Sequence, residues 1–253
     1  MDAARLARRL RDAETTRTPI PPLTDEVDLS VEEAYEVQQV TVDGFDPGTA
    51  PVAKLGLTSR AKQRQMSVDE PLSGWFDRRM ALDPGQPLHT DELIQPRIEP
   101  EVAFLLDRTL AGAGITAAHV LTATAAVMPA IDVLDSRFAG YRFTLADVVA
   151  DNASAARYVL GDPVPVDAID LRLVGCVLER NGALVATAAG AAVLDHPAAA
   201  VAWFVRTLAA RGQQLPAGSI VLAGALTAAV EVAAGDVVRA TIDRIGAVEL
   251  SCR

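Results

Sequence analysis

The stretch that decides the fold and the chemistry of this chain is Arg97-Ile98-Glu99-Pro100-Glu101-Val102-Ala103-Phe104-Leu105-Leu106. We interpret it as a β-strand that ends in an apolar run. Because side chains two residues apart on a strand share a face, Glu99 and Glu101 point the same way, with Cα atoms roughly 6.5–7 Å apart. Pro100 has no backbone N–H, so this strand is expected at a sheet edge or at a bulge.

Two carboxylates on one face repel each other unless a cation compensates them. A hard divalent cation such as Mg²⁺ or Mn²⁺ prefers carboxylate ligands. Asp132, inside the apolar strand predicted over 127–134, would be a third ligand and would leave open positions for water or substrate. The alternatives are a solvated strand face for the two glutamates and a buried ion pair of Asp132 with Arg137 or Arg157.

Two further polar side chains lie beside short apolar runs. Lys54 precedes a glycine in the strand predicted over 52–57. Burial and a nearby metal would lower its pKa, so Lys54 could transfer a proton or hold a carboxylate of the substrate. The alternative is a lysine at a strand end whose ammonium group reaches solvent. Ser154, in a polar cluster, could donate to a substrate oxygen or cap a turn.

Around these stretches the pattern indicates an α+β fold, with a small helical N-terminal region over 1–50 and a β-rich, metal-binding catalytic domain over 51–253. Residues 67–90 read as an ordered loop region, because Asp, Pro and Gly are frequent there. The predicted helices cover 3–14, 31–44, 60–66, 116–126 and 198–211. The predicted strands cover 52–57, 97–106, 127–134, 158–160, 170–179, 183–189, 219–222, 236–243 and 247–252.

The amino-acid composition argues against several classes of binding partner. The 253 residues include 23 Lys+Arg and 33 Asp+Glu, a net charge of −10, which argues against nucleic acid because phosphate binding requires clustered basic residues. No stretch reaches the ~20 apolar residues of a membrane span, so we expect no membrane association. Cys176 and Cys252 are too far apart in sequence to indicate a disulfide framework or a zinc motif. A reducing cytoplasm fits this cysteine usage.

Several stretches in this order resemble the fumarylacetoacetate hydrolase superfamily, and more closely its branch of hydratases and decarboxylases that act on 2-oxo acids from aromatic meta-cleavage. They run from about residue 29 to residue 236 and are LSVEEAYEVQQ, KLGLTSRAKQRQMSVDEP, PRIEPEVAFLL, PAIDVLDSRF, VVADNASAARYVLG, GAAVLDHPAAAVAWF and AGALTAAVEVAAGD. The resemblance implies a β-rich fold with a divalent-metal site of three carboxylates.

The same resemblance implies roles for individual residues. The metal ligands fall on Glu99, Glu101 and Asp132, and Asp132 is one methylene shorter than the glutamate usual in the family. The catalytic lysine and serine of the family fall on Lys54 and Ser154. The substrate-binding positions fall on Gly56, Leu57, Thr58 and Arg137.

Leu72 favours decarboxylation over hydration. Hydratases of the branch tend to have an acidic residue at this position, which works with the lysine to deliver water, whereas decarboxylases tend to have an apolar residue. The resemblance therefore places Leu72 among the catalytic residues. Residues 58–62 also look like the decarboxylase. Ser73, Trp75 and Ala223 depart from the family pattern.

We therefore expect a metal-dependent decarboxylase that converts 4-oxalocrotonate-type 2-oxo-3-enedioates to 2-hydroxydienoates. The alternatives are a 2-oxopent-4-enoate hydratase and a catalytically silent homologue that acts as a partner. The resemblance further implies a small-molecule 2-oxo acid as ligand, a homo-oligomer, and association with a homologous hydratase.

Overall fold

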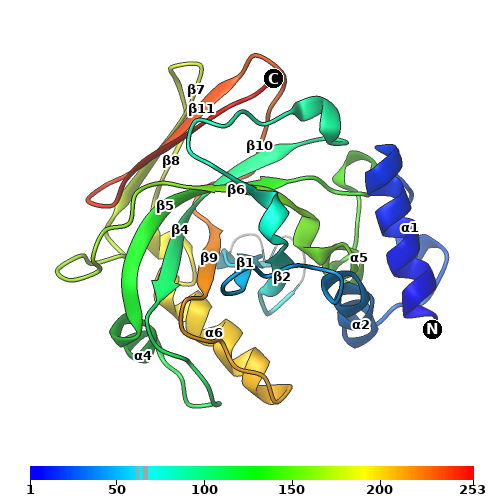
Figure 1. Ribbon diagram of the computed structural model, residues 1–253, viewed down its shortest axis with the longest axis horizontal. Helices are drawn as coiled ribbons and strands as arrows, with labels where there is room; N and C mark the ends of the chain where they lie inside the picture. The colour runs from blue at the N-terminus through cyan, green and yellow to red at the C-terminus, as the bar shows by residue number, and fades with distance from the viewer. Residues whose placement is uncertain (61–62, 65–67) are drawn as a thin grey trace.

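The computed structural model describes residues 1–60, 63–64 and 68–253. Two sheets form its body (Figure 1). The larger, mixed sheet contains, in spatial order, β2 (Leu72–Phe76), β1 (Val52–Gly56), β9 (Ile220–Ala225), β4 (Arg97–Leu106), β5 (Thr124–Leu134), β6 (Ala155–Leu160) and β3 (Ala81–Leu82), and β10 (Val230–Glu231) also pairs with β4. The smaller, antiparallel sheet contains β12 (Gly246–Ser251), β11 (Val237–Ile242), β7 (Gly175–Arg180) and β8 (Ala183–Ala189).

The helices lie in two groups. Near the N-terminus, α1 (Ala3–Thr16) and α2 (Val31–Val42) pack with α5 (Leu145–Ala150) at one end of the larger sheet (Figure 1). The second group is α4 (Ala117–Thr122) and α6 (Pro197–Ala210), which contact each other while α6 also contacts β1 and β9. Short 3₁₀ helices cover Leu23–Asp25, Arg78–Met80, Thr90–Glu92, Ala139–Tyr141, Asn152–Ser154 and Gly190–Ala192. The α+β fold with a mainly β body is thus confirmed.

Side chains alternate between the two faces of β4, so that one face packs in the core and the other carries the two glutamates. Val102 and Phe104 pack in the main apolar cluster with Phe204 of α6. Glu99 and Glu101 lie on the other face, because their positions differ by an odd number from those two. The strand therefore carries the carboxylates on a frame that is fixed from behind by apolar packing.

The expected strand over 97–106 is confirmed, but its expected place at a sheet edge is wrong, since β4 lies between β5 and β9. The bulge alternative is the correct one: the register between β4 and β9 shifts between Glu101 and Ala103. Pro100 lies directly before this shift, and its carbonyl accepts a hydrogen bond from Leu226 at 2.9 Å. The irregular pairing accommodates the missing N–H of Pro100.

The loop expected over 67–90 is wrong for part of its length, because β2 and β3 lie there. β2 contains Ser73 and Gly74 and so lacks a strand-like alternation; its pairing with β1, Lys54 opposite Gly74, determines its conformation. α5 and β10 were not expected either. The helix expected over 116–126 ends earlier, at Thr122.

Part of the helix expected over 60–66, and part of the decarboxylase-like segment 58–62, lie outside the described residues; Arg60, Gln63 and Arg64 are helical. The division of the chain at residue 50 stays a prediction. The packing of α2 against α5 joins the two sides of that division.

Candidate metal centre and its cavity

Three acidic side chains converge where β4 and β5 pair. Glu99 lies opposite Asp132 in the antiparallel register, and Glu101 shares its face of β4 with Glu99. One ligand oxygen from each of the three carboxylates lies within 4.8 Å of the others. Glu101 and Asp132 are 0% exposed, and Glu99 is buried. The structure therefore brings together the three side chains that the sequence analysis selected.

The surroundings of Glu101 are those of a carboxylate that could hold a cation. Burial and the charges of Asp132 and Glu99 raise the pKa of the Glu101 carboxyl well above its ordinary value. Its Oε2 accepts a hydrogen bond from the Gly224 N–H at 2.6 Å. Its Oε1 is buried and has no hydrogen-bond partner within the described chain. A buried oxygen without a partner and an all-carboxylate donor set both fit a hard divalent cation.

Lys54 brings a positive charge next to the three carboxylates. It lies on β1, its side chain is 2% exposed, and its Nζ lies 2.5 Å from Asp132 Oδ2. The alternative of an ammonium group that reaches solvent is therefore wrong. Asp132 forms an ion pair, but with Lys54 rather than with Arg137 or Arg157, which pair with other acids.

A cavity of about 320 Å³ opens beside the carboxylates. Several residues selected from the sequence line it, namely Lys54, Gly56, Leu57, Leu72, Glu99 and Ser154. The rest of its wall is largely apolar and includes Phe143 and Val148. Gly56 allows Leu72 to approach, because a Cβ at Gly56 would lie 2.7 Å from Leu72 Cδ1. Thr58 and Arg137 are not among the described residues that line this cavity.

Thr58 packs on the glycine that donates a hydrogen bond to Glu101. It is buried, and it packs so closely on Gly224 that a Cβ there would lie 2.0 Å from Thr58 Oγ1. Gly224 has a φ of +110°, a conformation that favours glycine. Because the Gly224 N–H donates to Glu101, this contact places Thr58 in support of one of the three carboxylates rather than on the cavity wall.

Arg137 lies in a buried network that ends at Ser154. Its Nε donates to Asp151 Oδ1, and its Nη1 donates to the Asp135 carbonyl at 2.8 Å. Asp151 Oδ2 accepts a hydrogen bond from Ser154 Oγ at 3.0 Å. Burial raises the pKa of Asp151 to about 6, although Arg137 acts in the opposite direction. Through Asp151, Arg137 orients the serine that lines the cavity.

The loop that carries Ser154 has an uncommon backbone. Asn152, Ala153 and Ser154 have φ values of 50°, 55° and 55°, which non-glycine residues adopt rarely and at a cost. The Asn152 side chain holds the loop to β2 by accepting from the Trp75 N–H at 2.9 Å and donating to the Trp75 carbonyl at 2.8 Å. Gly74 permits the approach, since a Cβ there would lie 2.6 Å from the Asn152 carbonyl oxygen.

The supporting role of Asn152 and Gly74 was not predicted from the sequence. The available signal was an asparagine two residues before the selected serine, because Asn tolerates the left-handed conformation better than most residues.

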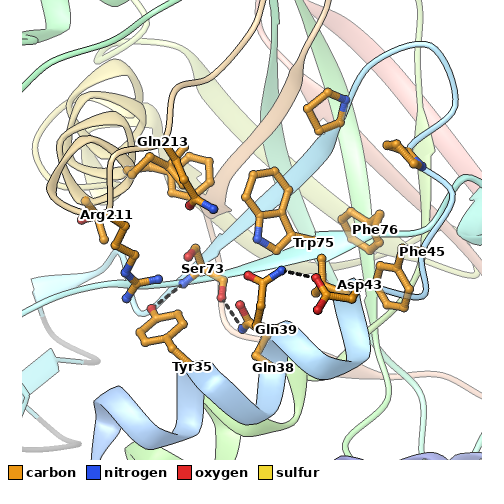
Figure 2. A pocket seen from close by; sticks show the side chains of 16 residues that line it. Tyr35, Gln38, Gln39, Asp43, Phe45, Ser73, Trp75, Phe76, Arg211 and Gln213 are labelled. Atoms are coloured by element: carbon orange, nitrogen blue, oxygen red, sulfur yellow. Dashed lines mark hydrogen bonds between the residues drawn. The ribbon is translucent and has the colours of Figure 1, made fainter.

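A second cavity of about 310 Å³ lies between α2, β2 and α6 (Figure 2). Figure 2 shows Tyr35 and Gln38 extending from α2 toward Ser73, which alternates with Leu72 along β2. Gln38 Nε2 donates to the Ser73 carbonyl at 2.8 Å, and the Ser73 N–H donates to Tyr35 Oη at 3.3 Å. These bonds hold β2 from behind and so help to position Leu72 at the carboxylate cavity.

In the part of the chain that the structure describes, every helix is too short or too polar to cross a membrane.

The chain belongs to the fumarylacetoacetate (FAA) hydrolase family, whose C-terminal domain model matches residues 49–252. It is similar to the 4-oxalocrotonate decarboxylase of Pseudomonas sp. (strain CF600), with 41% identity over 91% of this chain and 89% of that protein. It is also similar to the 2-keto-4-pentenoate hydratase of Paraburkholderia xenovorans (strain LB400), with 39% identity over 96% of this chain and 91% of that protein. The resemblance to this family and to its decarboxylase and hydratase branch is thereby confirmed.

A solved structure extends the likeness to three dimensions. The 4-oxalocrotonate decarboxylase from Pseudomonas putida G7, complexed with magnesium and adipate, has a TM-score of 0.94 and 34% identity to this chain. The match covers 99% of this chain and 97% of that one. The relative thus combines this fold with a divalent cation and a six-carbon dicarboxylate.

Proposed function

We propose that this protein is a metal-dependent decarboxylase that converts 2-oxo-3-enedioates such as 4-oxalocrotonate to 2-hydroxydienoates and CO₂. One observation carries the proposal: three buried carboxylates and Lys54 meet beside a cavity whose wall is apolar at Leu72. The decarboxylase relatives support it, because they match almost the whole chain.

Glu99, Glu101 and Asp132 are the residues that would hold Mg²⁺ or Mn²⁺. When bound, the cation would act as a Lewis acid that polarises the 2-oxo group of the substrate. The shorter Asp132 is held at the centre by its ion pair with Lys54. Glu101 is held by the Gly224 N–H, so each of these two residues has a partner in the protein that orients it.

Lys54 carries the proton chemistry in this proposal. The bond between the distal carboxylate carbon and its neighbour breaks, and the electron pair moves through the alkene to the 2-oxo oxygen as CO₂ leaves. The Lys54 ammonium, already buried beside Asp132, can stabilise the developing negative charge and donate a proton to that oxygen. Ser154 gives its one hydroxyl hydrogen to Asp151 in this structure, so it would have to turn that hydrogen away from Asp151 to donate it to the substrate.

The apolar side chain of Leu72 favours decarboxylation over hydration. Addition of water requires a general base, which a leucine side chain does not provide. An apolar wall also removes water from a departing carboxylate. A hydratase is the second candidate, since relatives with that name are 39% identical to this chain.

The test is incubation of the Mg²⁺-loaded protein with 4-oxalocrotonate and, separately, with 2-hydroxypenta-2,4-dienoate. We expect CO₂ release from the first compound and no loss of dienol absorbance from the second. Dienol consumption without CO₂ release would identify a hydratase. Inactivity toward both, together with no Mg²⁺ binding, would indicate the silent homologue.

Leu72→Asp, compared with the uncharged Leu72→Asn, checks the role of this position. We expect decarboxylation to fall further in the aspartate variant than in the asparagine variant, because the added charge repels the anionic group and retains water around it. Equal rates in the two variants would contradict an electrostatic role.

We also propose a homo-oligomer in the cytoplasm, which associates with a homologous hydratase that consumes the dienol product. Exposed apolar side chains, Leu173 at 75% and Leu184 at 65%, support self-association near β7 and β8. Light scattering of the purified protein, alone and mixed with the hydratase, tests both assemblies; a monomer that does not bind the hydratase would contradict them.

A further inference from the structure

Arg97 stands at the rim of the carboxylate cavity and has no role in the chemistry described above. It precedes Glu99 by two residues on β4, so both side chains lie on the same face, and both line the cavity. The Arg97 side chain is 29% exposed, whereas Glu99 is buried. Arg97 therefore lies between the metal centre and solvent.

The guanidinium group of Arg97 is held in one orientation. Its central carbon lies 4.0 Å from the centre of the Tyr141 ring, a cation–π contact. Tyr141 donates its hydroxyl hydrogen to the Gln95 carbonyl at 3.2 Å. Burial raises the pKa of Tyr141, so the ring carries no charge at neutral pH. Tyr141 also lines the cavity, and it gives Arg97 a rigid platform there.

The charge of Arg97 is available to a ligand. Among the described residues of the cavity wall, the cationic ones are Lys54 and Arg97. Lys54 already forms a buried ion pair with Asp132. The partner of Arg97 is Glu231, at 2.7 Å, and this carboxylate is 76% exposed, so that water screens the pair. A planar guanidinium also matches the two oxygens of a carboxylate.

The spacing fits a ligand with two carboxylates. Residues two apart on a strand are separated by roughly 6.5–7 Å. A six-carbon dicarboxylate spans a similar distance between its terminal carbons. A 2-oxo acid with its keto end at the metal centre would thus bring its other end to the rim.

We propose that Arg97 binds the distal carboxylate of a six-carbon 2-oxo dicarboxylate and so selects dianionic over monoanionic substrates. This inference rests on the proposed function, and it names the residue that defines the substrate class. Arg97 is a specificity-determining residue: the carboxylate that it binds is lost in the reaction, so the pair stabilises bound substrate more than the transition state. Its loss should therefore raise KM and leave kcat unchanged or higher.

The test compares two non-reactive ligands of equal chain length by calorimetry in the presence of Mg²⁺. 2-Oxoadipate carries the distal carboxylate, and 2-oxohexanoate lacks it. Arg97→Met removes the charge and retains much of the apolar stem. Arg239→Met is the matched control, because Arg239 lies on β11, outside the cavity, and pairs with Glu249 at 3.6 Å.

We expect Arg97→Met to weaken 2-oxoadipate binding roughly 10- to 100-fold and to leave 2-oxohexanoate binding within about twofold. Retained 2-oxohexanoate binding also shows that the variant is folded. Arg239→Met should bind both ligands like the original protein.

Two results would overturn the inference: an equal loss of affinity for both ligands, which would place Arg97 at the 2-oxo end or in the fold, and unchanged affinity for both. If the original protein binds neither ligand in Mg²⁺, the proposed function fails first. If it decarboxylates 4-oxalocrotonate but the variant keeps its KM, the proposed function stands and the role of Arg97 is refuted.

Discussion

Replacing Glu101 by Gln should change the stability of the protein in opposite directions with and without metal. Glu101 is fully buried beside two other carboxylates, and one of its oxygens lies within 4.8 Å of one oxygen of each. Glutamine has nearly the same shape, and its carbonyl oxygen can still accept the Gly224 N–H. The substitution therefore removes one negative charge with little change in packing.

The magnitude follows from Coulomb's law. Two unit charges 4.8 Å apart interact by about 3 kcal/mol at an effective dielectric constant of about 20. Ionised Glu101 faces two such neighbours, and Lys54 offsets part of their repulsion. We therefore expect the metal-free Glu101→Gln variant to be more stable by about 1–3 kcal/mol at pH 8. Mg²⁺ affinity should fall at least about 100-fold, because a neutral amide replaces a charged ligand.

The assay is urea denaturation at pH 8, after EDTA treatment and again with saturating Mg²⁺. Glu249→Gln is the matched control, since Glu249 is an exposed acid on β12. The control should change neither the metal-free stability nor the stabilisation by Mg²⁺. A metal-free Glu101→Gln protein that is less stable than the original, with an unchanged response to Mg²⁺, would refute the reasoning.

Three further predictions follow from the same geometry. Lys54→Met should lower kcat about 10²- to 10⁴-fold while calorimetry still detects Mg²⁺ binding; loss of Mg²⁺ binding would instead make Lys54 structural. Gly224→Ala should weaken Mg²⁺ binding, and in urea titrations it should lower the free energy of unfolding more than Gly112→Ala does. Both glycines have a positive φ, but of the two only Gly224 has a close neighbour, Thr58, that an added Cβ would meet. Equal losses of stability in the two variants would contradict this prediction. Metal-free Glu101 retains a proton above pH 4.5, which an unfolded glutamate has lost, so metal-free stability should fall as pH rises above 4.5. Mg²⁺ must displace that proton, so its affinity should rise with pH, and calorimetry in buffers of different ionisation enthalpy should detect proton release; no release would contradict the raised pKa.

The cluster of three carboxylates could be predicted from sequence because its elements follow short-range rules. The two-residue period of a strand places Glu99 and Glu101 on one face whatever the rest of the chain does. An acid inside an apolar strand, Asp132, indicates a partner, since isolated buried charges are costly. The register that sets Glu99 opposite Asp132 is a long-range property, so the residues alone left a buried ion pair of Asp132 open as the alternative.

Other features depended on tertiary contacts that no local pattern encodes. β2 forms where Asp, Pro and Gly indicated a loop, because it pairs with β1 and is held by Asn152 and Gln38. The supporting positions of Thr58 and Arg137 depend on Gly224 and Asp151, which are distant or unremarkable in sequence.

The most direct test of the account is a crystal structure with Mn²⁺ and 2-oxoadipate, in which anomalous scattering locates the metal. We expect one Mn²⁺ peak bound by Glu99, Glu101 and Asp132, with the 2-oxo acid end of the ligand completing its coordination. A peak elsewhere, or a ligand bound with its 2-oxo group away from these carboxylates, would contradict the central claim.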